Sequence, residues 1–139
     1  MTYKTQSAEE TLELGRSLAR QLPPKAVVLL IGNLGAGKTT LTKGIVEGLG
    51  AAHADEVSSP TFTLIHEYSP QVTHIDLYRL DTEQEVATLG LEDIFDRPGI
   101  VLIEWGERFP RLMPAERIEI RITASADEED TSSIEVKVA

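Results

Sequence analysis

The chain has 139 residues, a length typical of one domain, and we expect a single domain over residues 1–139. Apolar residues make up 41% and charged residues 26%, which is the composition of an ordinary globular protein with a self-sufficient core. The absence of cysteine excludes disulfides, thiolate zinc sites and a cysteine nucleophile.

The charge balance is strongly acidic. Thirteen basic residues against twenty-three acidic ones give a formal net charge of −10. Such a chain is a poor candidate for binding RNA or DNA by itself, because contacts with the nucleic-acid phosphates need a positively charged patch. The acidic run Asp127–Asp130 is interpreted as a solvated turn. Acidity does not oppose binding of a nucleotide, for which a few backbone amides and one lysine suffice.

Membrane and export signals are not found in the sequence. The longest apolar run is Ala26–Ile31, far below the roughly 18 residues of a membrane-spanning helix. The first ten residues lack a basic segment followed by an apolar stretch, so we expect no secretory signal. A cytoplasmic protein without membrane contact is the resulting expectation.

The first half of the chain predicts a helix, a buried strand and a second helix. Ser7 to Glu10 has the pattern of a capping box, and Pro23-Pro24 stops the helix that follows. Val27–Ile31 is a continuous branched apolar run, typical of a parallel strand covered on both faces. A glycine-rich turn leads into a helix over Lys38–Leu49, closed by Gly50.

The middle of the chain predicts two strands and two short helices. Thr61–Tyr68 and Val72–Tyr78 are expected to be strands, joined by a turn at Ser69–Gln71. Asp81–Gln84 is expected to open a short helix that Gly90 ends, and Leu91–Phe95 a further helical turn.

The last third predicts a second buried strand over Ile100–Ile103, then an irregular stretch over Gly106–Pro114. Alternating apolar residues beyond it predict a half-exposed antiparallel hairpin; they are Ile118, Ile120, Ile122, Ile134, Val136 and Val138. The chain is therefore predicted to be an α/β protein with a mostly parallel central sheet and antiparallel additions.

The strongest chemical motif follows the first buried strand. Gly32-Asn-Leu-Gly-Ala-Gly37-Lys38-Thr39 matches G-x-x-x-x-G-K-[ST], the phosphate-binding P-loop. Glycines let successive backbone amides point at the phosphates, and the helix that begins near Lys38 adds its positive end. Lys38 should reach the β and γ phosphates, and the Thr39 hydroxyl should bind Mg²⁺. The motif predicts a three-layer sandwich like that of P-loop nucleotide hydrolases.

A P-loop protein also needs an acid at the end of a neighbouring buried strand. Glu104 ends the better hydrophobic run, and Asp76 follows a half-polar strand. We interpret both as site residues, with Glu104 nearer Mg²⁺ and Asp76 able to position or deprotonate water. The hydroxyl-rich loop Ser58–Thr61 fits either a switch loop that brings Thr61 to Mg²⁺ or an ordinary strand entrance.

Four motifs carry a family resemblance. GNLGAGKTTL, SPTFTLIHEY, HIDLYRL and LIEWGER follow one another in this order. Together they resemble the TsaE (YjeE) family, small P-loop ATPases of bacterial tRNA threonylcarbamoyladenosine biosynthesis. The likeness spans about residues 7–107, and the last three motifs are more diagnostic than the P-loop. The hairpin after Pro114 carries no motif that matches.

The resemblance implies roles for particular residues. Lys38, Asp76, Thr61 and Glu104 would serve catalysis, and Thr39 and Glu104 would hold Mg²⁺. The residues implied in ATP binding are Ser7, Thr11, Asn33, Leu34, Gly35, Ala36, Gly37, Lys38, Thr39, Thr40 and Trp105. Asn33 departs from the family, where an acid is often expected, and its role stays open.

The resemblance also implies a partner. Such proteins associate with the two-subunit threonylcarbamoyl-transferase complex, and their ATPase cycle keeps that complex turning over. Contact with tRNA would be only indirect, which the acidic composition fits. Competing interpretations of the P-loop are a small-molecule kinase and a nucleotide-dependent binding module with little hydrolysis. A guanine-specific switch is disfavoured, since the sequence has no Asn-Lys-x-Asp motif.

Several residues are not assigned to the site. His53, His66 and His74 lack metal-ligand spacing and are interpreted as surface or structural, although His74 is close to Asp76 in sequence. Arg79 fits either a salt bridge or an arginine that stabilises transition-state charge. Trp105 fits a core position as well as a place beside the nucleotide.

The two candidate acids are distinguished by a comparison of alanine variants. We expect Glu104→Ala to weaken Mg²⁺-dependent nucleotide binding more than Asp76→Ala, because a lost metal ligand acts on binding and a lost water-positioning group acts on turnover. Titration calorimetry with and without Mg²⁺ measures the effect. A larger loss of binding in Asp76→Ala would reverse the metal assignment.

Overall fold

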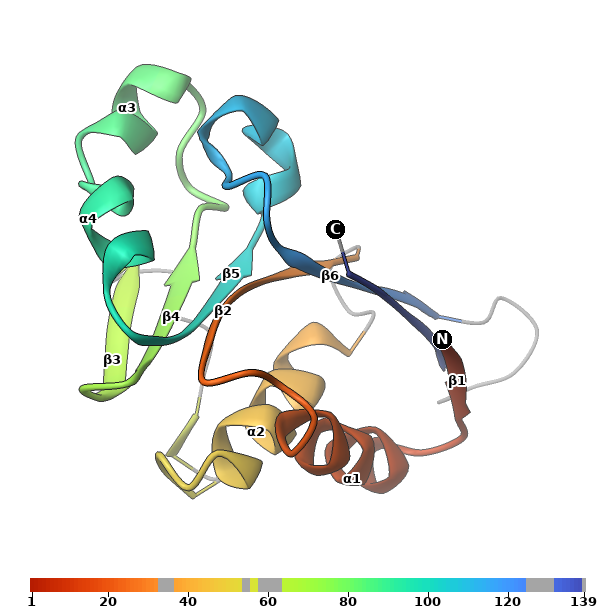
Figure 1. Ribbon diagram of the computed structural model, residues 1–139. Helices are drawn as coiled ribbons and strands as arrows, with labels where there is room; N and C mark the ends of the chain where they lie inside the picture. Colours follow the sequence, from red (N-terminus) through yellow and green to blue (C-terminus); the bar gives the residue numbers. More distant parts are fainter. Residues whose placement is uncertain (33–36, 54–55, 58–63, 125–131, 139) are drawn as a thin grey trace.

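The computed structural model of the chain describes residues 1–32, 37–53, 56–57, 64–124 and 132–138. These residues form one seven-stranded sheet in the order β1-β7-β6-β2-β5-β4-β3 (Figure 1). The strands are β1 (Thr2–Thr5), β2 (Lys25–Ile31), β3 (Ile65–Ser69), β4 (Val72–Asp76), β5 (Gly99–Glu104), β6 (Ile118–Ala124) and β7 (Ser132–Val138). The helices are α1 (Ala8–Ala19), α2 (Lys38–Gly48), α3 (Glu83–Ala87), α4 (Leu91–Asp96) and the single-turn 3-10 helices η2 (Gly106–Arg108) and η3 (Pro110–Leu112).

The centre of the sheet is parallel and its margins are antiparallel. Strand β2 pairs in parallel with β5 and β6, and β5 pairs in parallel with β4. Strands β3, β7 and β1 are added antiparallel to β4, β6 and β7. The predicted α/β class, with a mostly parallel centre and a C-terminal hairpin, is confirmed.

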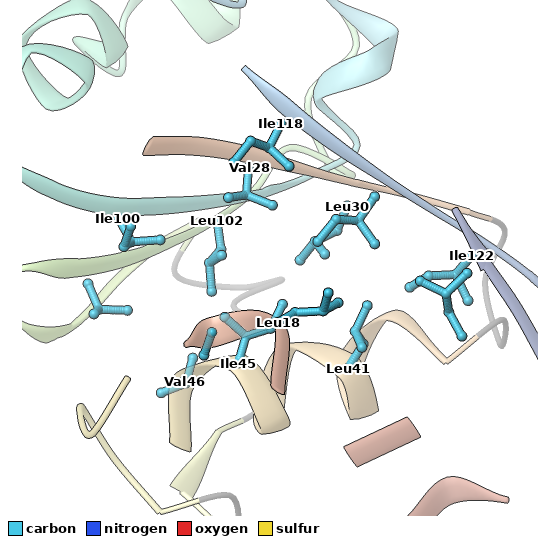
Figure 2. Packing of buried hydrophobic residues seen from close by; sticks show 14 of the residues in the cluster. Leu18, Val28, Leu30, Leu41, Ile45, Val46, Ile100, Leu102, Ile118 and Ile122 are labelled. Atoms are coloured by element: carbon cyan, nitrogen blue, oxygen red, sulfur yellow. The ribbon is translucent and has the colours of Figure 1, made fainter. Parts of the chain in front are cut away.

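Helices cover both faces of the sheet, which makes three layers (Figure 1). On one face, α1 and α2 pack on alternate residues of the central strands; Figure 2 shows Leu41, Ile45 and Val46 of α2 beneath Leu30 and Leu102 of the sheet. On the other face, α3, α4 and the 3-10 helices pack on the intervening residues. Burial on both faces explains why β2 and β5 are continuous apolar runs.

Local features set the helix ends. The Ser7 hydroxyl accepts a hydrogen bond from the Glu10 N–H at 3.1 Å, and the Glu10 carboxylate accepts from the Gln6 N–H, so the predicted cap forms with a small shift. Gly50, at φ +73°, follows the last turn of α2 as expected. Among the described helices none is long and apolar enough to cross a membrane.

The structure corrects three expectations. The helix α3 is capped by Thr82 and ends at Ala87, so Gly90 does not end it; at φ +69° Gly90 instead precedes α4. The stretch 106–114, predicted to be irregular, forms two single-turn 3-10 helices. Strand β1 was not predicted, because its pairing with β7 comes from the far end of the chain. The predicted loop 58–60 and the start of the strand expected from Thr61 lie outside the described residues.

The two helices on one face touch at glycines. A Cβ placed on Gly44 would lie 2.1 Å from the Leu12 carbonyl oxygen, and one on Gly15 would lie 2.5 Å from the Leu41 carbonyl oxygen. Neither carbonyl oxygen can move away from such a Cβ unless α1 and α2 separate. The two glycines therefore allow α1 and α2 to pack closely against each other.

We expect Gly44→Ala to lower the free energy of unfolding by about 1–3 kcal/mol, because overpacking outweighs the gain in helix propensity. Chemical denaturation measures the change. Gly50→Ala is the matched control, since a Cβ there meets nothing within 4 Å and only the left-handed backbone is strained. A Gly44→Ala variant as stable as the wild-type protein would contradict the close helix contact.

Candidate functional site

The candidate site lies where three parallel strands end. Strands β2, β5 and β4 are neighbours, so their carboxyl ends meet at one edge of the sheet. Glu104 is the last residue of β5, and Asp76, the last of β4, stands opposite it in register. Helix α2, the next element after β2, begins at the same edge with Lys38. The parallel sheet thus brings together a helix N-terminus and two carboxylates from distant parts of the sequence.

Lys38 is the first residue of α2 and is almost completely buried, with 5% of its surface exposed. It follows Gly37, whose φ of +100° is a conformation that a side chain would strain. The Lys38 Nζ atom has no hydrogen-bond partner among the described residues. It lies 3.6 Å from the centroid of the Trp105 ring, over the negative face of the indole.

Trp105 marks the sharp exit of the chain from β5. Its φ of +68° turns the backbone out of the strand directly after Glu104. The indole packs against the Tyr78 ring, with centroids 5.1 Å apart. Trp105 packs against the core of its face of the sheet as well as beside Lys38, and its place beside a nucleotide stays a prediction.

The two strand-end carboxylates are both buried but are held differently. Asp76 is 2% exposed, and its Oδ1 accepts a hydrogen bond from the Tyr78 backbone N–H at 2.8 Å. Glu104 is 3% exposed, and its Oε2 lies 2.6 Å from Nε2 of His74. One acid is therefore oriented by its own strand end, and the other by a side chain from the neighbouring strand.

The charges of the site act on one another. Burial lowers the pKa of Lys38, while the negative charges of Glu104, Glu107 and Asp76 oppose this shift. Burial raises the pKa of the Glu107 carboxyl; its own backbone N–H and the positive charges of Lys38, Arg121 and Arg108 oppose that shift. A single ammonium group thus faces several carboxylates in a region poorly reached by water.

The structure brings some of the predicted site residues together. Lys38, Asp76, Glu104 and Trp105 lie at one edge, and Thr39 and Thr40 stand on the first turn of α2 beside Lys38. The predicted residues Asn33, Leu34, Gly35, Ala36 and Thr61 lie outside the described residues. The roles of all these residues in catalysis and in binding stay predictions.

Ser7 and Thr11 lie at the junction of β1 and α1, where both serve local structure. The Ser7 hydroxyl caps α1, and the buried Thr11 Oγ1 lies 2.7 Å from Thr5 Oγ1. Thr5 pairs with Ser132, whose Oγ lies 4.0 Å from the position of a Cβ on Gly37. The junction therefore lies close to the end of the P-loop, which is consistent with the predicted nucleotide contact.

Two residues near the site were not assigned from the sequence. His74 was interpreted as surface or structural, but it is completely buried and contacts Glu104. Glu107 has a buried Oε1 without a partner among the described residues. The sequence did contain one indication that His74 lies near the site. It stands two residues before Asp76, and that spacing puts both side chains on one face of a strand.

The residues present fit a bound triphosphate. An orphaned, buried ammonium at a helix N-terminus is a group that a phosphate would satisfy. Among the described residues, no group of three or more His, Asp or Glu side chains is arranged to hold a metal by itself.

Comparison with known proteins decides the family. Residues 5–133 match the sequence profile described as threonylcarbamoyl adenosine biosynthesis protein TsaE. The chain belongs to the TsaE family. The resemblance drawn from the four motifs is thereby confirmed, and TsaE proteins are named for tRNA threonylcarbamoyladenosine biosynthesis.

Individual TsaE relatives match over most of their length. The Bacillus subtilis protein named tRNA threonylcarbamoyladenosine biosynthesis protein TsaE is 41% identical, over 93% of this chain and 81% of its own. The Treponema pallidum protein of the same name is 37% identical, over 91% and 94%. The crystal structure of Bacillus subtilis YdiB covers all of this chain and 84% of its own, with a TM-score of 0.78 and 34% identity.

The buried carboxyl of Glu107 predicts a pH dependence of stability. Because its pKa is raised in the folded protein, the folded state holds the proton more tightly than the unfolded chain, and ionisation lowers stability. We expect Glu107→Gln to be more stable than wild type near about pH 7, with the difference shrinking as the pH falls toward about 4.3, the ordinary pKa of glutamate.

Thermal unfolding over this pH range measures the difference. Glu116→Gln, an exposed position, controls for the exchange of carboxylate for amide. If Glu107→Gln were less stable than wild type at neutral pH, the charged form of Glu107 would be stabilising, and burial would not dominate.

Proposed function

We propose that this TsaE protein is a Mg²⁺-dependent ATPase that supports the threonylcarbamoyl-transferase complex in tRNA N6-threonylcarbamoyladenosine modification. The single observation that carries the nucleotide assignment is the buried, unpartnered Lys38 ammonium at the N-terminus of α2, facing Asp76 and Glu104. The biosynthetic assignment rests on the names of the relatives.

ATP would be held by its phosphates. The N-terminal amides of α2 and the partial positive charge of the helix suit a polyanion, and Lys38 supplies the full charge. Leaving the Trp105 ring for a phosphate would give the ammonium the strong hydrogen bonds it lacks among the described residues. The protein groups proposed to bind ATP therefore contact its phosphates, which carry the charge that changes during the reaction.

Mg²⁺, when bound, would neutralise charge that develops on the phosphates. The Thr39 hydroxyl and the Glu104 carboxylate are the protein groups proposed to hold it. Asp76 is proposed to orient the attacking water and to accept its proton. Its Oδ1 accepts the Tyr78 N–H, which fixes the direction of the carboxylate. Thr61 is proposed to belong to a switch loop.

Slow turnover of the isolated protein is part of the proposal. Arg108 donates to the Tyr78 carbonyl oxygen at 2.9 Å and lies 3.6 Å from Asp81, so its guanidinium is already engaged by these two residues. We propose that contact with the threonylcarbamoyl-transferase complex completes the site. The net charge of −10 fits a cytoplasmic protein that meets other proteins and reaches tRNA only through them.

The test compares phosphate release from Mg·ATP in wild type, Lys38→Ala and Lys43→Ala. We expect Lys38→Ala to lose roughly 10²-fold or more, because a preorganised charge on the transferring phosphoryl group is removed. Lys43→Ala, a neighbour on the same helix, should retain activity. Adding the two-subunit complex should raise the wild-type rate.

Other outcomes identify other functions. Transfer of phosphate to an added metabolite would indicate a small-molecule kinase. Tight nucleotide binding without turnover, with or without the complex, would indicate a binding module. Equal activity in Lys38→Ala and wild type would refute the proposed phosphate site.

A further inference from the structure

A buried histidine links β3, β4 and β5 beneath the candidate site. His74 is completely buried in the middle layer. Its Nε2 lies 2.6 Å from Oε2 of Glu104, and its Nδ1 lies 3.3 Å from the Tyr68 hydroxyl. The Tyr68 and His74 rings are tilted against each other with centroids 6.1 Å apart. Both ring nitrogens are thus engaged by side chains of neighbouring strands.

The sheet register explains this contact. Alternation along β4 places His74 on the same face as Asp76, two residues further on. His74 stands opposite Leu102 in β5, and Glu104 follows two residues later on the same face. The imidazole therefore reaches diagonally to the carboxylate that ends the next strand, on the face that α2 covers.

The geometry of the two contacts indicates how the ring holds Glu104. A carboxylate oxygen accepts hydrogen bonds, so the contact of 2.6 Å calls for an N–H donor at Nε2 of His74. The Tyr68 hydroxyl can donate to Nδ1 or accept from it, so that contact holds the ring from its other side. The ring thereby holds one carboxylate oxygen, and Tyr68 holds the ring.

We propose that His74 is a positioning residue that holds Glu104 in the orientation required for Mg²⁺, with Tyr68 supporting the ring from its other side. The inference rests on the proposed function, because it takes Glu104 to serve the metal. With Oε2 engaged by the imidazole, Oε1 is the oxygen left for the metal or its water. Holding one oxygen restricts rotation of the Glu104 carboxylate, so less conformational entropy is lost when the other oxygen binds the metal.

A merely structural role for this pair makes different predictions. A buried histidine that only fills space would affect stability when replaced, and the Mg²⁺ requirement would not change. A positioning residue alters the metal dependence specifically and acts through Glu104. Metal dependence of nucleotide binding is thus a readout that separates the two roles without relying on turnover.

The first experiment measures the Mg²⁺ concentration at half-maximal binding of a non-hydrolysable ATP analogue by calorimetry. His74→Asn removes the Nε2 donor and should raise that concentration about 10-fold, as is typical when support of a metal ligand is lost. His74→Gln places an amide donor near the Nε2 position and should recover part of the loss. His53→Gln is the matched control, since His53 is exposed and hydrogen-bonds to Glu56 through its backbone.

The second experiment repeats His74→Asn in a Glu104→Gln background. If His74 acts through Glu104, the two changes are not additive, and His74→Asn adds little to the Mg²⁺ requirement. The same change in both backgrounds, or an unchanged requirement in folded His74→Asn, overturns the positioning role while leaving nucleotide binding intact. Wild-type protein without Mg²⁺-dependent nucleotide binding overturns the proposed function first.

The third experiment begins with the wild-type protein. Nitrogen-15 NMR of the histidine rings should show His74 protonated at Nε2, the nitrogen that faces Glu104. Tyr68→Phe should shift the Nδ1 resonance, because its hydroxyl partner is removed. A ring protonated at Nδ1 alone would place no proton toward Glu104 and would overturn the inference.

Discussion

The structure depends on the burial of one positive charge at the edge of a parallel sheet. Moving an ammonium group out of water is unfavourable unless other groups compensate. Here the Trp105 ring and the carboxylates of Asp76, Glu104 and Glu107 compensate in part, and Nζ still lacks a hydrogen bond among the described residues. A hydrogen-bond acceptor such as a phosphate oxygen is the group that this ammonium lacks among the described residues.

The fold supplies the rigidity that this arrangement needs. Strands β2, β5 and β4 are fixed by apolar residues on both faces, so Glu104 and Asp76 are held in register with each other. Helix α2 is fixed by its close glycine contact with α1, which packs on the same face of the sheet. The distances between the Lys38 ammonium at the helix end and the carboxylates of Glu104 and Asp76 at the strand ends are therefore fixed by the fold.

The two carboxylates illustrate two ways of orienting a side chain. Asp76 uses a backbone N–H two residues away, so its orientation follows from the local turn. Glu104 uses the His74 ring, which in turn contacts Tyr68 on a third strand. The hydrogen bond from Tyr78 to Asp76 is local in sequence, whereas the contacts around His74 require three strands to be aligned. This difference in how the two carboxylates are held fits their different proposed roles, Glu104 in holding Mg²⁺ and Asp76 in orienting water.

The sequence by itself determined the α/β class, the buried strands and the place of Asp76 and Glu104 at the ends of two of them, because apolar periodicity and the acids that follow apolar runs are local patterns. Four motifs were also sufficient for the family. Only the tertiary structure decided the addition of β1, the position of Lys38 on Trp105 and the burial of His74 against Glu104. Each of these is a contact between segments far apart in the chain, and such contacts exist only after strand order and register are set.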